Sequence, residues 1–130
     1  MTLERKFVLV IEDDPALRDA LVELLSDEGI PVEAAPNGKT ALERLRAGLR
    51  PAAILLDLWM PEMDGSSFRS EQLSDAALRD IPIAVFTGSA NADGFEARFP
   101  DVETIRKPVN AAQLVDVVRR LARMSRDSEA

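Results

Sequence analysis

Side chains suited to phosphoryl chemistry follow four short apolar runs of this 130-residue chain. Glu12 and Asp13 come after the first of these runs, Asp57 closes the next, and Thr87 and Lys107 follow the last two. A carboxylate, a hydroxyl donor and a fixed cation can together stabilise a phosphoryl group. Carboxylates that repel one another in a cleft can be neutralised by a divalent cation such as Mg²⁺. We therefore expect one phosphoryl-handling site, provided that the fold brings these residues together.

Each of these residues also has a more common structural role. Asp13 and Asp14 can cap a helix, and Asp57 can belong to the turn that follows it. Thr87 is a typical β-branched strand residue, and Lys107 is a typical solvated lysine. The chemical interpretation therefore rests on the position that they share at strand ends, and not on any one residue.

Composition excludes several other kinds of site. The chain has no histidine and no cysteine, so disulfides, thiolate or histidine metal sites and serine–histidine catalysis are ruled out. A metal ion must be bound by oxygen atoms, which favours Mg²⁺, Ca²⁺ or Mn²⁺. With 16 Lys and Arg against 23 Asp and Glu, the net charge is −7, and we expect no direct binding to nucleic acid or membranes. We find no signal peptide or membrane-spanning segment and expect a cytoplasmic protein.

Five short apolar runs predict five strands. The runs are Phe7–Ile11, Pro31–Ala35, Ala52–Leu56, Ile81–Phe86 and Val102–Ile105. Three of them are nearly continuous, which is typical of strands that are buried on both faces of a parallel sheet. Such sheets bind ligands at the carboxyl ends of their strands, where the candidate site residues lie.

Helical patterns alternate with these runs. The predicted helices begin at Asp14-Pro15, run from about Gly38 to Ala47, begin near Ser66, fall within Ala90–Phe99, and begin at Asn110. Strands that alternate with helices predict an α/β fold with a parallel sheet. We expect a single domain over residues 1–130, ordered from about 6 to 124, with a frayed tail at 125–130.

Four segments, taken in order, resemble the receiver domain of bacterial two-component response regulators. The segments are Glu12-Asp13, Leu55–Gly65, Phe86-Thr87-Gly88 and Arg106-Lys107-Pro108, and the resemblance extends from about Lys6 to Met124. It implies a flavodoxin-like fold, in which a five-stranded parallel sheet of order 2-1-3-4-5 carries five helices on its two faces.

The resemblance also implies roles for the site residues. Asp57 would accept a phosphoryl group from a histidine kinase or a histidine phosphotransfer protein. Thr87 and Lys107 would then bind phosphoryl oxygens, and the Lys107–Pro108 bond would be cis. Mg²⁺, or Mn²⁺ in its place, would be bound by Glu12, Asp13, Asp57 and the backbone carbonyl of Trp59.

By the same resemblance, the protein would be a phosphoacceptor that assists its own phosphorylation and dephosphorylation, and it would not be an enzyme in the usual sense. Phosphorylation would switch a surface that a downstream protein binds, and a dimer is compatible with this role. Family members usually carry an aromatic residue three positions before the lysine, where this chain has Thr104. The usual aromatic switch is therefore absent or replaced.

Three further expectations concern single segments. The fourth helix is predicted to be short, distorted or mobile, because Gly94 interrupts it and Pro100 follows it. Trp59 and Ser89 lie where the family controls access of the hydrolytic water, so that a bulky Trp59 predicts slow self-dephosphorylation. On the last helix, one strip of small apolar residues either is exposed for a partner or packs in the core; it consists of Val115, Val118 and Ala122.

Three other functions remain open at this point. A binding module of the same fold could work without phosphorylation, as Thr104 and the broken fourth helix suggest. A Mg²⁺-dependent phosphohydrolase with an aspartyl nucleophile would use a second acid two residues later, where this chain has Trp59. A flavin-binding protein would need a phosphate-cradling loop, which we do not find.

Overall fold

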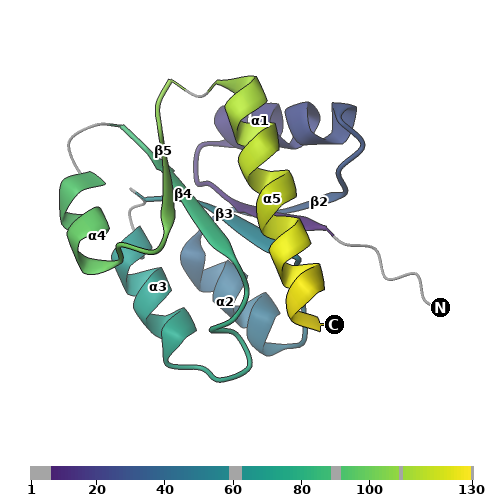
Figure 1. The fold of residues 1–130 in the computed structure, drawn as a ribbon. Helices are drawn as coiled ribbons and strands as arrows, with labels where there is room; N and C mark the ends of the chain where they lie inside the picture. Colours follow the sequence, from purple (N-terminus) through teal and green to yellow (C-terminus); the bar gives the residue numbers. More distant parts are fainter. Residues whose placement is uncertain (1–6, 59–62, 89–91, 109, 130) are drawn as a thin grey trace.

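The computed structural model describes residues 7–58, 63–88, 92–108 and 110–129, and it forms a parallel sheet of order β2-β1-β3-β4-β5 (Figure 1). This order confirms the predicted flavodoxin-like architecture. In sequence, the elements are β1 (Val8–Ile11), α1 (Pro15–Asp27), β2 (Val32–Ala35), α2 (Gly38–Arg46), β3 (Ala53–Asp57), α3 (Gly65–Leu73), β4 (Ile83–Thr87), α4 (Ala92–Arg98), β5 (Glu103–Arg106) and α5 (Ala111–Glu129).

Helices cover both faces of the sheet, and two apolar clusters fill the space between the layers. One cluster joins strand residues such as Leu9 and Leu56 to α2, α3 and α4, and the other joins Val10 and Leu55 to α1 and α5. Successive strand residues enter opposite clusters, because side chains alternate between the two faces of a sheet. Both faces are therefore buried, as the continuous apolar runs predicted.

The first and the last helix of the chain begin where the sequence predicted. The Asp14 side chain accepts a hydrogen bond from the backbone N–H of Ala16 (3.0 Å), and the Asn110 side chain accepts one from the N–H of Gln113 (3.0 Å). Each cap satisfies a backbone donor that has no partner within its helix. These two helices, α1 and α5, lie on the same side of the sheet (Figure 1).

The last helix settles one open alternative and continues past one expected limit. Val115 and Val118 are buried against α1 and the sheet, so the strip of small apolar residues packs mainly in the core, which is one of the two expected alternatives. The helical backbone continues through Glu129, beyond Met124, where we expected the ordered chain to end. Residues 125–129 contain no Pro or Gly that would interrupt a helix.

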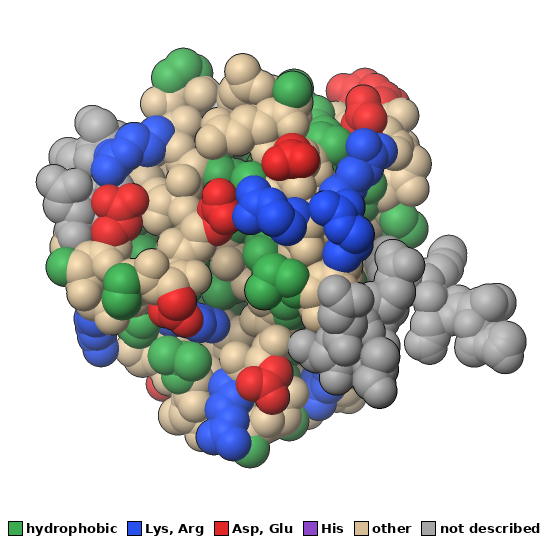
Figure 2. All heavy atoms as spheres, viewed as in Figure 1, with side chains coloured by type: hydrophobic (Ala, Val, Ile, Leu, Met, Phe, Trp, Pro, Cys, Tyr) green, Lys and Arg blue, Asp and Glu red, His purple; other side chains and the backbone are tan. Residues whose placement is uncertain are grey.

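The fourth helix is short, as predicted. It spans Ala92–Arg98, and the buried rings of its Phe95 and of Phe99, the residue that follows the helix, lie 4.9 Å apart in one of the two apolar clusters. Over the face formed by α4, β5 and α5, acidic and basic side chains lie next to one another (Figure 2). No helix in the described ranges is long and apolar enough to span a membrane.

A tight contact joins the end of β3 to the start of α3. The backbone N–H of Gly65 donates to the carbonyl of Leu58 (2.9 Å). A Cβ atom at position 65 would lie 2.5 Å from Leu58 Cδ1 and 3.1 Å from Leu58 Cα. Only glycine fits here without displacing Leu58, so the backbone just after Asp57 is held against the first turn of α3.

We predict that Gly65→Ala destabilises the fold by about 1–3 kcal/mol, because the added methyl group collides with Leu58. Gly94→Ala is the matched control. No atom lies within 4 Å of a Cβ at position 94, so alanine should be neutral there or stabilise α4 by up to about 1 kcal/mol. Urea unfolding of both variants measures the difference, and equal effects would show that the contact between Gly65 and Leu58 is unimportant.

Candidate functional site

The strand register brings the predicted site residues to one edge of the sheet. In β1 and β3, Ile11 pairs with Leu56, so Glu12 and Asp57 follow paired positions. Asp57 itself pairs with Phe86 of β4, and Thr87 pairs with Arg106 of β5, next to Lys107. The carboxyl ends of four strands therefore meet at this edge, as parallel pairing requires.

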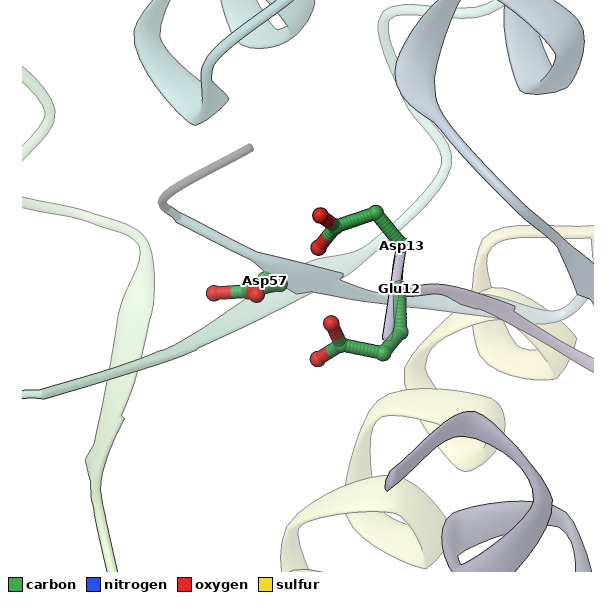
Figure 3. Close-up of side chains that lie close together, drawn as sticks. All are labelled: Glu12, Asp13 and Asp57. Carbon is green, nitrogen blue, oxygen red and sulfur yellow. The ribbon is translucent and has the colours of Figure 1, made fainter. Parts of the chain in front are cut away.

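Three carboxyl groups form the centre of the site. Ligand oxygens of Glu12, Asp13 and Asp57 all lie within 4.8 Å of one another. In Figure 3, the carboxyl groups of Glu12 and Asp13 extend from the end of β1 toward the side on which Asp57 lies. Asp13 is exposed, whereas Glu12 and Asp57 are only 1% and 4% exposed. Two acidic groups are thus largely removed from water.

Local hydrogen bonds fix the Glu12 side chain and backbone. Oε2 of Glu12 accepts from the backbone N–H of Asp14 (3.0 Å), and the Glu12 carbonyl accepts from Nη1 of Arg18 (3.0 Å). The other carboxyl oxygen, Oε1, is buried and has no hydrogen-bond partner within the described residues. A buried acceptor without a partner is costly, and a cation or a proton would relieve that cost.

The pKa of Glu12 is raised from 4.5 to about 8, mainly by burial. The charge of Asp57 and the adjacent side chains of Asp13 and Asp57 contribute to this rise, whereas the hydrogen bond from Asp14 opposes it. At neutral pH and without a cation, Glu12 therefore tends to keep its proton. The donor set, with three carboxyl groups and one unsatisfied oxygen, fits a hard divalent cation.

Lys107 supplies a positive charge beside Asp57. Its Nζ lies 3.8 Å from Oδ1 of Asp57, and its side chain is 33% exposed. Its backbone N–H donates to the carbonyl of Thr87 (2.8 Å). The Lys107–Pro108 bond is cis, as the sequence resemblance implied.

Thr87 is buried at the end of β4, and its side chain is engaged locally. Its hydroxyl donates to the carbonyl of Gly88 (2.8 Å). The remaining predicted ligand, the backbone carbonyl of Trp59, lies outside the described residues, as does Ser89. The structure thus brings Glu12, Asp13, Asp57 and Lys107 together and places Thr87 on the adjoining strand.

Two contacts at the site were not predicted from the sequence. Arg18 binds the Glu12 carbonyl from the first turns of α1, and the Lys107 ammonium lies over the ring of Phe86, 5.2 Å from its centroid. An arginine on an amphipathic helix and a phenylalanine in an apolar strand are both ordinary. No sequence signal therefore distinguishes these residues.

Comparison with known proteins gives a consistent assignment. Residues 8–119 match the family described as response regulator receiver domain. Protein Rrf1 of Nitratidesulfovibrio vulgaris is 32% identical over 114 residues, which cover 87% of this chain and 80% of that protein. Response regulator MprA of Mycobacterium bovis is 34% identical over 95% of this chain, which spans 53% of that relative.

Solved structures show the same architecture. The signal receiver domain of a signal transduction histidine kinase from Syntrophus aciditrophicus has a TM-score of 0.80 and 30% identity, with 90% of this chain and 89% of that one covered. A response regulator receiver domain protein from Clostridium thermocellum has a TM-score of 0.83 at 21% identity, with 93% and 97% covered. At this low identity, the match to the Clostridium thermocellum protein is evidence for the fold alone.

We predict that Glu12 makes stability depend on pH when divalent cations are removed. The pKa of Glu12 rises on folding from 4.5 to about 8, so the folded state binds its proton more tightly than the unfolded state does. The stabilisation is complete below pH 4.5 and is lost as the pH rises through about 8. Each pKa unit corresponds to about 1.4 kcal/mol, so the total loss is on the order of a few kcal/mol.

Urea unfolding in EDTA between pH 4 and 9 measures this dependence. Glu12→Gln cannot ionise, so it should gain stability relative to the parent as the pH rises. Glu23→Gln, at an exposed position of α1, should follow the parent. Parallel curves for the parent and Glu12→Gln would contradict the assignment.

Proposed function

The chain belongs to the response regulator receiver domain family, and from this membership and the site we propose a switch that phosphorylation of Asp57 controls. The phosphoryl donor is a phosphohistidine on a histidine kinase or a phosphotransfer protein. One observation carries the proposal: Asp57 lies within 4.8 Å of two other carboxylates and 3.8 Å from the Lys107 ammonium. A group of residues that only stabilises the core would not need these clustered charges.

The proposed transfer uses an oxygen of Asp57 as the nucleophile. A new P–O bond forms on Asp57 while the P–N bond of the donor phosphohistidine breaks, and the imidazole nitrogen keeps the electron pair of that bond. Lys107 lies beside Oδ1 of Asp57, where its charge offsets negative charge on the phosphoryl oxygens. Asp57 is 4% exposed, so little water competes with these contacts.

Glu12, Asp13 and Asp57 are the residues that would hold Mg²⁺ or Mn²⁺ in this proposal, together with the Trp59 carbonyl that the resemblance implies. A bound divalent cation supplies charge neutralisation, both for the clustered carboxylates and for the phosphoryl group. The unsatisfied Oε1 of Glu12 supports this assignment. Without such a cation, the single positive charge of Lys107 would not balance the charges of three carboxylates.

Thr87 connects the site to the remainder of the protein. Its hydroxyl donates to the Gly88 carbonyl (2.8 Å), and we propose that it donates to a phosphoryl oxygen after transfer. That exchange would free the Gly88 carbonyl at the start of the connection to α4. The response cannot use an aromatic side chain three positions before the lysine, because Thr104 occupies that position in β5. The hydroxyl oxygen of Thr104 is buried and lacks a hydrogen-bond partner among the described residues.

The downstream target in this proposal is a protein that reads the changed surface. A cytoplasmic location, a dimer and slow self-dephosphorylation stay predictions of the sequence. The alternative of a phosphorylation-independent binding module is less well supported, because it leaves the buried carboxylates and the adjacent lysine without a role. A phosphohydrolase is also not favoured, since position 59 offers no second acid.

We predict that acetyl phosphate with Mg²⁺ adds one phosphoryl group to the protein, measured by intact mass. Asp57→Asn should abolish the addition, because the amide cannot form the acyl phosphate. Asp64→Asn is the matched control, since Asp64 is an exposed cap of α3 and asparagine caps a helix equally well. Equal labelling of Asp57→Asn and the parent would refute Asp57 as the acceptor.

We also predict that Mg²⁺ raises the thermal stability of the protein and that EDTA reverses the effect. A cation at 100 times its dissociation constant adds about 2.7 kcal/mol if it binds only the folded state. Asp13→Asn should weaken this stabilisation, whereas Asp19→Asn, at an exposed position of α1, should keep it. If Asp13→Asn responds to Mg²⁺ like the parent, Asp13 is not a ligand.

A further inference from the structure

The face of the Phe86 ring contacts the Lys107 ammonium. Nζ of Lys107 lies over this ring at 5.2 Å from the centroid, and the same nitrogen lies 3.8 Å from Oδ1 of Asp57. An aromatic ring carries partial negative charge on its face and attracts a cation within about 6 Å. The ammonium is therefore attracted by a ring and a carboxylate that belong to two adjacent strands.

The sheet fixes these three residues relative to one another. Phe86 pairs with Asp57 in the ladder between β3 and β4, and its carbonyl accepts from the N–H of Leu58 (3.0 Å). The backbone N–H of Lys107 donates to the Thr87 carbonyl (2.8 Å). Asp57 and Phe86 are paired across β3 and β4, so their side chains lie on the same face of the sheet as Leu55, and the Lys107 ammonium reaches both of them.

Phe86 and Lys107 differ in how firmly they are held. The ring of Phe86 is fully buried in the cluster beneath α1 and α5, whereas the Lys107 side chain is 33% exposed. A lysine has a long flexible stem, and a partly exposed ion pair alone does little to immobilise it. The rigid ring face can supply the missing constraint.

We propose that Phe86 is a positioning residue that holds the Lys107 ammonium at Asp57 through its ring face. The proposal rests on the proposed function, because its consequence is a lysine placed in advance to meet the phosphoryl oxygens. Phe86 does not touch the reacting atoms. Its contribution depends on the charge of the ring face, which a purely structural core residue would not require.

Stepwise fluorination of Phe86 separates these two roles. Replacement by 4-fluoro-, 3,5-difluoro- and 3,4,5-trifluorophenylalanine nearly preserves the shape of the ring but progressively removes negative charge from its face. We expect the rate of phosphorylation by acetyl phosphate to fall at each step, by about threefold to tenfold over the series. Phe68 is the matched control, because it is fully buried in the other apolar cluster and has no cation contact among the described residues.

A second cycle tests whether the effect acts through Lys107. In Lys107→Met, which keeps an extended side chain without charge, fluorination of Phe86 should no longer change the remaining rate. If trifluorination lowers the rate equally in the parent and in Lys107→Met, or equally at positions 68 and 86, the proposal is overturned. A rate that fluorination of Phe86 leaves unchanged overturns it as well.

An NMR measurement on the cation-free protein examines the contact without any phosphorylation. The ring current of Phe86 should shift the Lys107 side-chain protons upfield, and Phe86→Leu should remove that shift. Absence of the shift in the parent overturns the proposal. A parent that shows the shift but is not phosphorylated by acetyl phosphate would instead overturn the proposed function, so the two failures are distinguishable.

Discussion

Burial of acidic side chains at one edge of the sheet is the constraint on which this site depends. The register of β1 and β3 forces Glu12, Asp13 and Asp57 to within 4.8 Å of one another, and two of the three are almost fully buried. Burial and mutual repulsion together raise the pKa of Glu12 to about 8. The negative charge must be balanced by a proton, by Lys107 or by a cation, and this requirement makes the edge sensitive to what binds there.

The rest of the fold keeps these charges in place. Apolar clusters on both faces of the sheet hold the strands, and the contact between Gly65 and Leu58 holds the backbone after Asp57. Each site residue lies at the end of a strand or just beyond it, where the connecting segments begin.

Phe86 belongs both to the apolar core and to the surroundings of the site. Its ring packs beneath α1 and α5, and the same ring lies under the Lys107 ammonium. The stability of the sheet and the position of the charge beside Asp57 are thus linked physically. On the output side, the chain has Thr104 in β5 and a short α4, whose Phe95 packs against the following Phe99.

Local signals were sufficient to predict the elements of the fold and the edge at which the site lies. The continuous apolar runs indicate strands buried on both faces, and Asp14-Pro15 and Asn110 start helices through contacts within one turn. Periodicity shows which residues share a face, but it does not show what covers that face, so the burial of Val115 and Val118 depended on the packing of α5. The raised pKa of Glu12 and the position of Lys107 over Phe86 likewise required tertiary structure. Both arise from residues that are distant in the chain and that only strand register and burial bring together.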